Sequence, residues 1–238
     1  MYNIGMKILD DIDYRVEREV LLDAVNFQGG KLIVHDENAA IVDMGDWYKC
    51  AFRTASAFAA HKASLRKGNE ACVMGANSLD PAEFGIGSLE TPPCKSFAYL
   101  GAMPPELDLP RGVVIKRLAP SLAETVAKAY NHNPVGYSPE RMAEIMRTMG
   151  VFGAIADGKL AGFIGRHKEG SMGMLEVFEA FRRKGIASAL EKFMIGYVMT
   201  FGRTPFCDVF ADNAASLALQ DKLGMTASNF YTFWLEIE

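Results

Sequence analysis

One stretch of this sequence constrains the fold more than any other, because a strand-like run ends there in a basic turn and a helix begins. The strand-like run covers residues 174–178, and the helix-like pattern covers residues 186–199. The turn between them carries positive charge and a glycine: Arg182, Arg183, Lys184 and Gly185. Backbone N–H groups in the first turn of a helix lack partners within the helix, and the helix dipole adds partial positive charge there. The stretch therefore predicts a site that binds an anion such as a phosphate.

Composition and charge narrow the classes of protein to which the chain can belong. Half of the 238 residues are hydrophobic, which allows a sizeable core in one large domain or two small ones. The net charge of −4 provides no broad basic surface, so we expect no nucleic-acid partner. No apolar run approaches the roughly 20 residues that span a bilayer, and the N-terminus lacks the apolar core of a signal peptide. We therefore expect a cytoplasmic protein with no membrane association.

The cysteines and histidines predict neither a metal site nor a redox centre. The four cysteines are widely spaced and form no C-x-x-C pair: Cys50, Cys72, Cys94 and Cys207. Such residues are typical of small buried thiols in a reducing cytoplasm. His35, His61 and His167 show no metal-ligand spacing either. We expect no metal cofactor.

The first half contains no basic glycine turn and is predicted as a separate domain, residues 1–108. We expect helices over residues 8–27 and 47–65 and a short helix beginning at Asp80. The expected strands cover residues 31–35, 39–43, 70–74 and 94–100. Three prolines within residues 104–110 discourage regular structure and mark the boundary with the second domain, residues 109–238.

The second half is predicted as a strand, two helices and a three-strand meander that lead to the basic turn. The expected strands cover residues 113–118, 151–156, 160–166, 174–178, 205–211 and 229–237. The expected helices cover residues 119–130, 138–150, 186–199 and 213–223, with Ser138 as an N-cap. This order of elements predicts a mixed α/β fold.

Two motifs of the second half carry a family resemblance. The spacing Arg182-x-x-Gly185-x-Ala187 after a strand resembles the coenzyme A signature of the GNAT acetyltransferase superfamily. Residues 213–225 look like the closing helix of that superfamily. The first half is similar, by element order alone, to the N-terminal half of the glycine N-acyltransferase-like branch. The resemblance implies an α/β (α+β) fold with a mixed central sheet flanked by helices, preceded by a degenerate half-copy of the same fold.

The resemblance also implies acetyl-CoA, or another acyl-CoA, as co-substrate. Its pyrophosphate would lie at the basic turn, and its pantetheine arm would lie along the main chain of the preceding strand. The residues implied to bind it are Leu175, Glu176, Val177, Arg182, Arg183, Lys184, Gly185, Ile186, Ala187, Ser188, Asn213 and Ser216. A solvated basic turn is the alternative for residues 182–185, and capping of its own helix is the alternative for Asn213.

Acyl transfer to an amine needs a group that takes a proton, and two carboxylates are candidates. Glu176 lies on the strand before the turn, and Asp208 lies in an apolar strand, an environment that suits a base. Each is otherwise an ordinary polar residue of its strand. Gln220 stands where many members of the superfamily have a tyrosine that protonates the leaving thiolate. Glutamine can donate a hydrogen bond but cannot act as an acid, and Tyr231 or Tyr137 could replace that tyrosine.

The acceptor is the least constrained part of the prediction. His132 and Tyr137 belong to a loop that borders the acceptor site in this superfamily, so both are candidate substrate contacts. We expect an N-acetyltransferase whose acceptor is a primary amine of a small molecule or amino acid, which attacks the thioester directly. One alternative is a CoA-binding regulator or sensor with weak catalysis. Another is an interaction module whose first half forms a homodimer.

Overall fold

The structure is a computed structural model that describes residues 6–76, 92–130 and 136–237. Contacts within the chain define two compact units. Unit 1 contains Met1–Tyr99 and Phe206–Glu238, and unit 2 contains Leu100–Pro205. The contacts therefore group the end of the chain with its first half, whereas the domains expected from the sequence, 1–108 and 109–238, follow chain order and stay a prediction.

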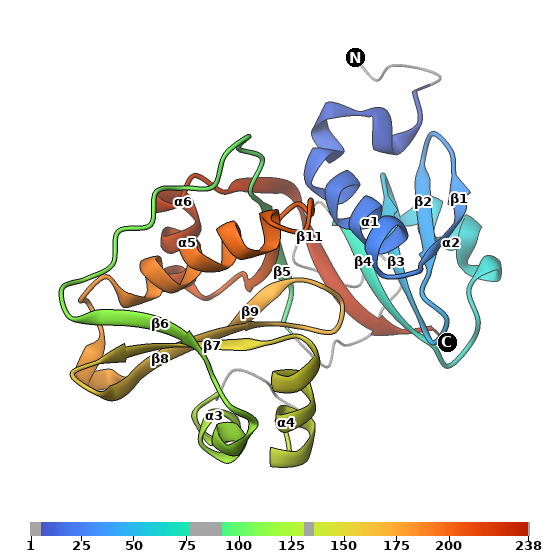
Figure 1. Ribbon diagram of the computed structural model, residues 1–238. Coiled ribbons are helices and arrows are strands. Elements are labelled where there is room, and N and C mark those ends of the chain that lie inside the picture. Colours follow the sequence, from blue (N-terminus) through green and yellow to red (C-terminus); the bar gives the residue numbers. More distant parts are fainter. Residues whose placement is uncertain (1–5, 77–91, 131–135, 238) are drawn as a thin grey trace. The chain divides into compact units, whose positions relative to one another are not determined.

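Unit 1 is built on a mixed sheet, and its seven described strands have the order β1-β2-β3-β4-β11-β5-β10 (Figure 1). β3 and β4 pair in parallel, and the other neighbours pair antiparallel. Strand β5 of the first half lies between two strands from the end of the chain. The strands are β1 (Lys31–His35), β2 (Ala39–Asp43), β3 (Trp47–Phe52), β4 (Glu70–Ala76), β5 (Cys94–Ala98), β10 (Phe206–Phe210) and β11 (Thr226–Glu236).

Helices cover both faces of this sheet. The apolar side of α1 (Arg15–Phe27) packs with Trp47 and Phe206 on one face. Phe58 of α2 (Ala55–His61) packs with side chains of the opposite face. The remaining helical segments in the described part of the unit are η1 (Ile8–Asp10), η2 (Ile12–Tyr14), η3 (Lys62–Ser64) and α6 (Ala214–Lys222). The four cysteines, all of them described residues, are buried and form no disulfide, as expected.

The predicted helix over residues 47–65 is wrong. Trp47–Phe52 is strand β3, in which all six side chains are buried, and only Ala55–His61 forms an α-helix. A central strand that is buried on both faces shows no polar alternation, so its apolar spacing resembles that of a buried helix. Thr54 separates the two elements, because its side chain accepts a hydrogen bond from the Ala57 N–H and caps α2.

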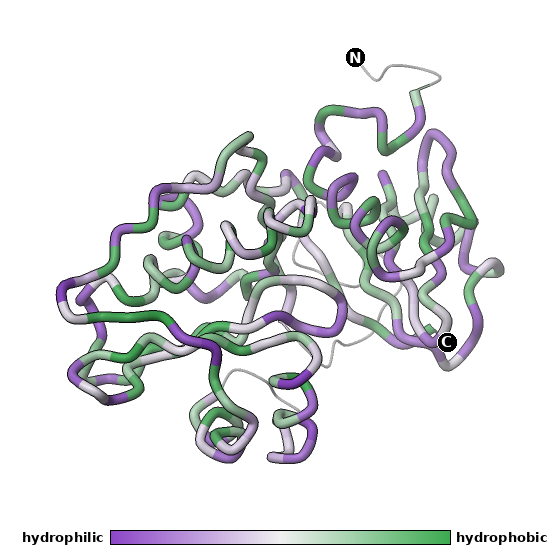
Figure 2. The backbone as a smooth tube through the Cα atoms, in the orientation of Figure 1, coloured by the Kyte–Doolittle hydropathy of each residue, from purple (hydrophilic) through white to green (hydrophobic). Residues whose placement is uncertain are grey.

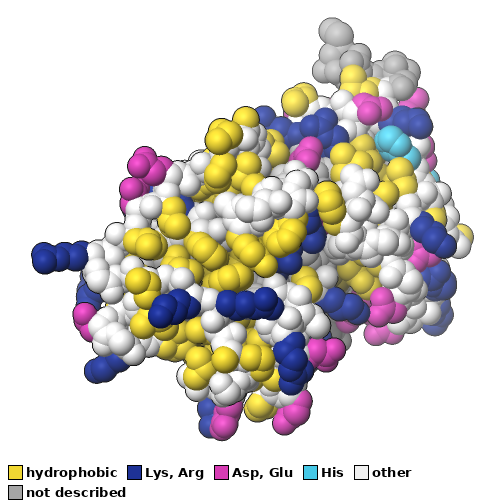
Figure 3. Space-filling view, viewed as in Figure 1, with side chains coloured by type: hydrophobic (Ala, Val, Ile, Leu, Met, Phe, Trp, Pro, Cys, Tyr) yellow, Lys and Arg dark blue, Asp and Glu magenta, His cyan; other side chains and the backbone are white. Residues whose placement is uncertain are grey.

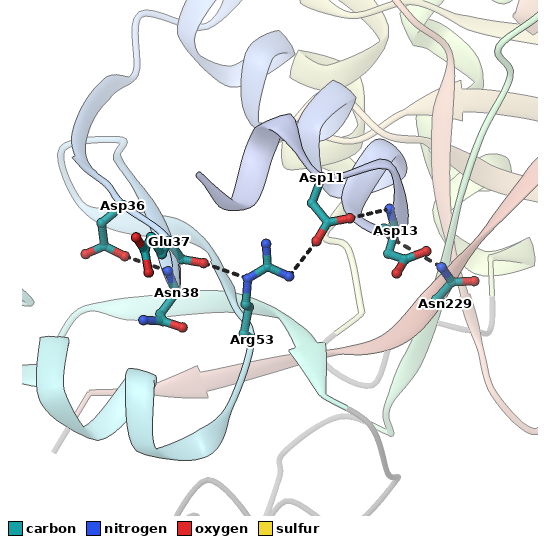
Figure 4. A network of polar contacts seen from close by, with 7 residues as sticks. All are labelled: Asp11, Asp13, Asp36, Glu37, Asn38, Arg53 and Asn229. Carbon is teal, nitrogen blue, oxygen red and sulfur yellow. Dashed lines mark hydrogen bonds and ion pairs between the residues drawn. The ribbon is translucent and has the colours of Figure 1, made fainter. Parts of the chain in front are cut away.

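A polar network joins the N-terminal segments of unit 1 to the hairpin between β1 and β2 (Figure 4). Arg53 donates to the Asp11 carboxylate at 2.6 Å and to the Glu37 carbonyl oxygen at 2.6 Å. The Asp13 carbonyl oxygen accepts from Asn229 at the other end of the chain. The network connects segments that are distant in sequence, which stabilises the fold of unit 1.

Unit 2 contains an antiparallel sheet of four described strands in the order β6-β7-β8-β9 (Figure 1). The strands are β6 (Val113–Arg117), β7 (Val151–Ala156), β8 (Lys159–Arg166) and β9 (Met172–Val177). The helices are η5 (Pro120–Leu122), α3 (Ala123–Ala129), α4 (Pro139–Thr148), η6 (Glu179–Phe181) and α5 (Ile186–Met199). Figure 2 shows β6 changing from hydrophobic to hydrophilic toward its end.

Helices flank this sheet too. Val151 of β7 packs in a core with side chains of α3 and α4. The ring of the next residue, Phe152, packs against Phe193 and Tyr197 of α5 in tilted and edge-on arrangements. Successive side chains of a strand point to opposite faces, so α5 covers the face opposite to α3 and α4. Among the described residues, no helix is both long and apolar enough to span a bilayer.

The segment that precedes β6 has no regular structure, as its prolines predict, and runs along α5. Asp108 accepts a hydrogen bond from Lys192 at 3.3 Å. A Cβ on Gly196 would lie 3.6 Å from Pro104. Figure 3 shows hydrophobic side chains gathered on one face of unit 2. The exposed large hydrophobic side chains of the segment are Leu100, Met103, Leu107 and Leu109.

Candidate functional site

The backbone of the basic turn between β9 and α5 has a conformation that suits an anion. Arg183 and Gly185 both have left-handed backbones, with φ of 60° and 79°. Gly185 is the N-cap of α5, and no side chain caps this helix end. Turns that combine left- and right-handed residues direct successive N–H groups toward one point, where they bind anions. The start of α5 therefore has the backbone conformation that the predicted anion site requires.

Conformation, rather than lack of space, requires glycine at position 185. A Cβ there would lie 3.6 Å from the Cγ of Pro110, an ordinary contact. A left-handed backbone is unfavourable for residues with a Cβ. Ile186 is 2% exposed and anchors the first turn of α5 in the core, whereas Gly185 is exposed. A ligand can thus approach the main chain at the helix start.

Two of the three basic side chains of the turn, those of Arg182 and Lys184, make local hydrogen bonds. Arg182 donates to the Val177 carbonyl oxygen at 3.0 Å and to Glu176 Oε1 at 3.2 Å. The Lys184 Nζ donates to the Ala180 carbonyl oxygen at 2.9 Å. All three basic side chains of the turn are exposed. Positive charge at a free helix start fits a pyrophosphate, and arginine can donate two parallel hydrogen bonds to phosphate oxygens.

Strand β9, which leads to the turn, contains a bulge. Phe163 pairs with Glu176 and Gly165 pairs with Gly173, so Met174 and Leu175 together lie opposite a single residue of β8. Met174 has a left-handed backbone with φ of 52°. Bulges break the regular ladder and redirect the main chain. In the described sheet β9 is an edge strand, and it carries Leu175, Glu176 and Val177, the residues predicted to contact the pantetheine arm.

Aromatic side chains of unit 2 gather near Glu176. The Tyr137 hydroxyl oxygen lies 3.3 Å from His167 Nδ1. The Tyr137 ring stacks on the Tyr130 ring, with 6.0 Å between the ring centres. Burial raises the pKa of the Tyr130 phenol, with smaller contributions from Tyr137 and Glu169. The Glu176 charge also acts on Tyr130, so the cluster and this candidate base lie within electrostatic reach of each other. His132, the other predicted substrate contact, lies outside the described residues.

Asp208, the second candidate base, lies in unit 1 and has partners that the sequence did not indicate. The Ser96 hydroxyl is 2.5 Å from Asp208 Oδ1, and the two residues are directly opposite in the pairing of β5 with β10. Thr232 of β11 lies 2.8 Å from the same Ser96 oxygen. No local motif marks Ser96 or Thr232. Only the long-range pairing of their strands could have identified them.

The start of the closing helix shows one of the two roles expected for Asn213. The Asn213 side chain accepts a hydrogen bond from the Ser216 N–H at 3.1 Å, so Asn213 caps α6. Its predicted bond to a pantetheine arm stays a prediction, as does the role of Ser216. Gln220 is only 2% exposed and lies within the fold of unit 1. In the described part of the chain, no group of three or more His, Cys, Asp or Glu side chains is arranged to hold a metal ion.

Comparisons with known proteins support the same fold. The family model described as FR47-like protein matches residues 148–235, which include the basic turn. No curated protein sequence matches the chain. A Drosophila protein of known structure is 15% identical with a TM-score of 0.59, and the similarity covers 99% of this chain and 100% of that one.

Two further solved structures are described as acetyltransferases. A GNAT-family protein from Novosphingobium aromaticivorans is 18% identical with a TM-score of 0.52, covering 85% of this chain and 89% of that one. A GCN5-related N-acetyltransferase from Kribbella flavida is 14% identical with a TM-score of 0.52, covering 94% and 95%. The chain thus has the mixed α/β GNAT fold, which confirms the predicted fold class. The glycine N-acyltransferase-like branch and the degenerate first half stay predictions.

Proposed function

We propose that the chain is an acyl-CoA-dependent N-acyltransferase that transfers acetyl from acetyl-CoA to a primary amine of a small molecule or amino acid. The observation that carries the proposal is the turn at residues 182–188. It combines two left-handed residues, three basic side chains and a helix start without a side-chain cap. The GNAT fold of the two acetyltransferase structures supports the proposal.

The residues of the turn fit the phosphates of coenzyme A. Main-chain N–H groups of residues 183–188 would bind the pyrophosphate, and Arg182, Arg183 and Lys184 would balance its charge. The main chain of Leu175 to Val177 would hold the pantetheine arm. Acetyl-CoA supplies the thioester whose carbonyl carbon the amine attacks. A main-chain N–H of β9 would then donate a hydrogen bond to the carbonyl oxygen. Removing such a donor from an enzyme lowers kcat on the order of 100-fold.

Either candidate carboxylate accepts a hydrogen bond that would orient it as a base. Glu176 is 11% exposed and accepts from the Arg182 guanidinium. Asp208 accepts from Ser96. The carboxylate that acts as the base should, on replacement by its amide, flatten one limb of the pH–rate profile while acyl-CoA binding persists.

The buried Gln220 favours a second candidate function, a CoA-binding regulator or sensor with weak catalysis. Glutamine cannot protonate a leaving thiolate, and this side chain is 2% exposed. Acetyl-CoA binding by calorimetry, followed by thiol release with a panel of primary amines, separates the two functions. The transferase predicts turnover with at least one amine, and tight binding without turnover across the panel would favour the regulator.

Three further expectations stay proposals. These are a small-molecule amine as the partner, a homodimer as the assembly, and the cytoplasm as the compartment. Sedimentation of the intact chain tests the homodimer. A monomer at micromolar concentration would contradict it, and the transferase proposal would be unaffected because the basic turn is formed within one chain.

A further inference from the structure

Buried polar side chains gather between α1 and the edge of the seven-stranded sheet in unit 1. Phe206 and Ala98 belong to the core under α1. Asp208 lies two residues after Phe206 in β10, and Ser96 lies two residues before Ala98 in β5. Residues two apart in a strand point to the same face, so Asp208 and Ser96 lie on the face that α1 covers. The group consists of the buried side chains of Glu17, Ser96, Ser228 and Thr232 and the half-buried side chain of Asp208. Buried groups of this kind are costly unless they are hydrogen-bonded.

Ser96 is at the centre of a short chain of hydroxyl groups that ends on Asp208. Its side chain is fully buried, and Thr232 is 1% exposed. The Ser96 oxygen lies 2.5 Å from Asp208 Oδ1 and 2.8 Å from Thr232 Oγ1. These distances fit hydrogen bonds between oxygens, with the shorter bond typical of an ionised acceptor.

The chemistry of the three groups fixes the direction of these bonds. An ionised carboxylate only accepts, so the single proton of the Ser96 hydroxyl points to Asp208. Thr232 must then donate to the Ser96 oxygen. Because a hydroxyl that accepts one hydrogen bond donates a stronger one, Thr232 strengthens the bond from Ser96 to Asp208.

We propose that Ser96 is a positioning residue that orients the Asp208 carboxylate and stabilises its ionised form, with Thr232 fixing the direction of the Ser96 proton. The inference rests on the proposed function, in which Asp208 is a candidate base. It gives the first half of the chain a part in the chemistry, because β5 supplies the hydroxyl that supports a carboxylate of the second half.

Other titratable groups lie around Asp208, and their titration must be distinguished from that of Asp208. Burial raises the pKa of the Cys72 and Cys94 thiols, so both stay neutral. Burial also raises the pKa of Glu17, which interacts with the charge of Asp208 and whose carboxylate accepts from Ser228. The titratable groups that interact with Asp208 or with these neighbours are Glu17, Lys49, Cys50, Cys72, Cys94, Lys95 and Asp212. Glu17 is therefore the carboxyl group whose titration has to be distinguished.

The test is the titration of the Asp208 side-chain carboxyl by carbon NMR, assigned with Asp208→Asn. Ser96→Ala removes a hydrogen bond to the charged form, so the pKa of Asp208 should rise by about one unit, a tenfold change in proton affinity. Thr232→Val should raise it by less, and it provides a second variant if Ser96→Ala does not fold. In turnover assays, kcat of Ser96→Ala should fall about tenfold at a pH below the wild-type pKa of Asp208, where the ionised fraction of this carboxylate differs tenfold between the two proteins. Its KM for acetyl-CoA should be unchanged.

Ser228→Ala is the matched control, because it removes a buried serine–carboxylate bond of the same sheet. A purely structural role predicts similar effects for both serines. Our inference predicts that Ser228→Ala leaves the Asp208 pKa unchanged or lowers it, since a more protonated Glu17 repels Asp208 less. An unchanged titration in Ser96→Ala and Thr232→Val would overturn the inference even in an active enzyme. Absence of turnover in the wild type, with the titration shift present, would overturn the proposed function alone.

Discussion

At the scale of single residues, Gly75 allows two central strands of unit 1 to approach each other closely. Its φ is 106°, and a Cβ there would lie 2.0 Å from the Phe52 carbonyl oxygen. Both the backbone conformation and the contact exclude a side chain. We predict that Gly75→Ala lowers the free energy of unfolding by about 3 kcal/mol or more.

Gly68→Ala is the control for this prediction. Gly68 also has a positive φ, of 81°, but no atom lies within 4 Å of a Cβ placed there. The strain of the left-handed backbone alone should cost about 1 kcal/mol. Urea denaturation of both variants measures the difference. Equal losses for Gly68→Ala and Gly75→Ala would contradict the close approach.

The ion pair between Asp43 and Arg66 should make the stability of the fold depend on pH. The two hydrogen bonds from Arg66, at 2.8 and 2.9 Å, lower the pKa of Asp43, and the Gly45 N–H adds to this effect. A pKa that is lower in the folded state than the unfolded value of about 3.9 gives stability that is present at neutral pH. This stability is lost as the pH falls through the folded pKa.

Asp43→Asn should therefore lower the melting temperature at pH 7, and the difference from the wild type should close below about pH 4. Asp221→Asn, at an exposed position of α6, is the control and should follow the wild-type profile. A difference between Asp43→Asn and the wild type that stays constant down to pH 2 would mean that the Arg66 pair contributes nothing through ionisation.

At the scale of elements, two helices provide a matched pair of N-caps. The Asn213 side chain accepts from the Ser216 N–H in α6, and the Ser138 side chain accepts from the Arg141 N–H in α4. Replacing either cap by alanine should cost about 1 kcal/mol of stability. Asn213→Asp should restore the stability, because aspartate caps equally well.

Asn213→Asp also tests the second role predicted for this residue. If Asn213 only caps its helix, Asn213→Asp should bind acetyl-CoA with the wild-type affinity in calorimetry. A stable Asn213→Asp variant with a weaker affinity would instead support a bond from the Asn213 amide to the pantetheine arm.

The sequence predicted the elements whose signals are local. The helix Ile186–Met199 and the turn before it follow from apolar spacing and one glycine, and both are found as expected. The strand Trp47–Phe52 was missed, because its six buried side chains lack the alternation of a strand with one exposed face. The bonds from Ser96 to Asp208 and Thr232 depend on strands that are far apart in the sequence, so no local pattern could reveal them.

At the scale of the whole molecule, unit 1 needs both ends of the chain. β5 has β10 and β11 as its neighbours, and β4 pairs with β11. A chain that ends at residue 205 would leave β5 without either neighbour, whereas the sheet of unit 2 would keep its four described strands. We predict that the 1–205 fragment retains the dispersed NMR signals of unit 2 and loses those of unit 1.

A fragment of residues 100–205 is the control for that experiment, and its spectrum should overlay the surviving signals. The result bears on the predicted domains 1–108 and 109–238 as folding units. Dispersed signals from β1–β4 in the 1–205 fragment would contradict the prediction and indicate that the first half folds without the end of the chain.

The central claim is that the turn before α5 binds the phosphates of acyl-CoA, and calorimetric titration with acetyl-CoA tests it most directly. Gly202→Glu is the matched control, because Gly202 lies beyond the other end of α5 with a similar φ of 68°. The account predicts that the wild type and Gly202→Glu bind with equal affinity. Gly185→Glu, which brings negative charge to the anion site, should bind at least about tenfold more weakly, or about 1.4 kcal/mol. Wild-type affinity in Gly185→Glu, or no binding by the wild type, would contradict the claim.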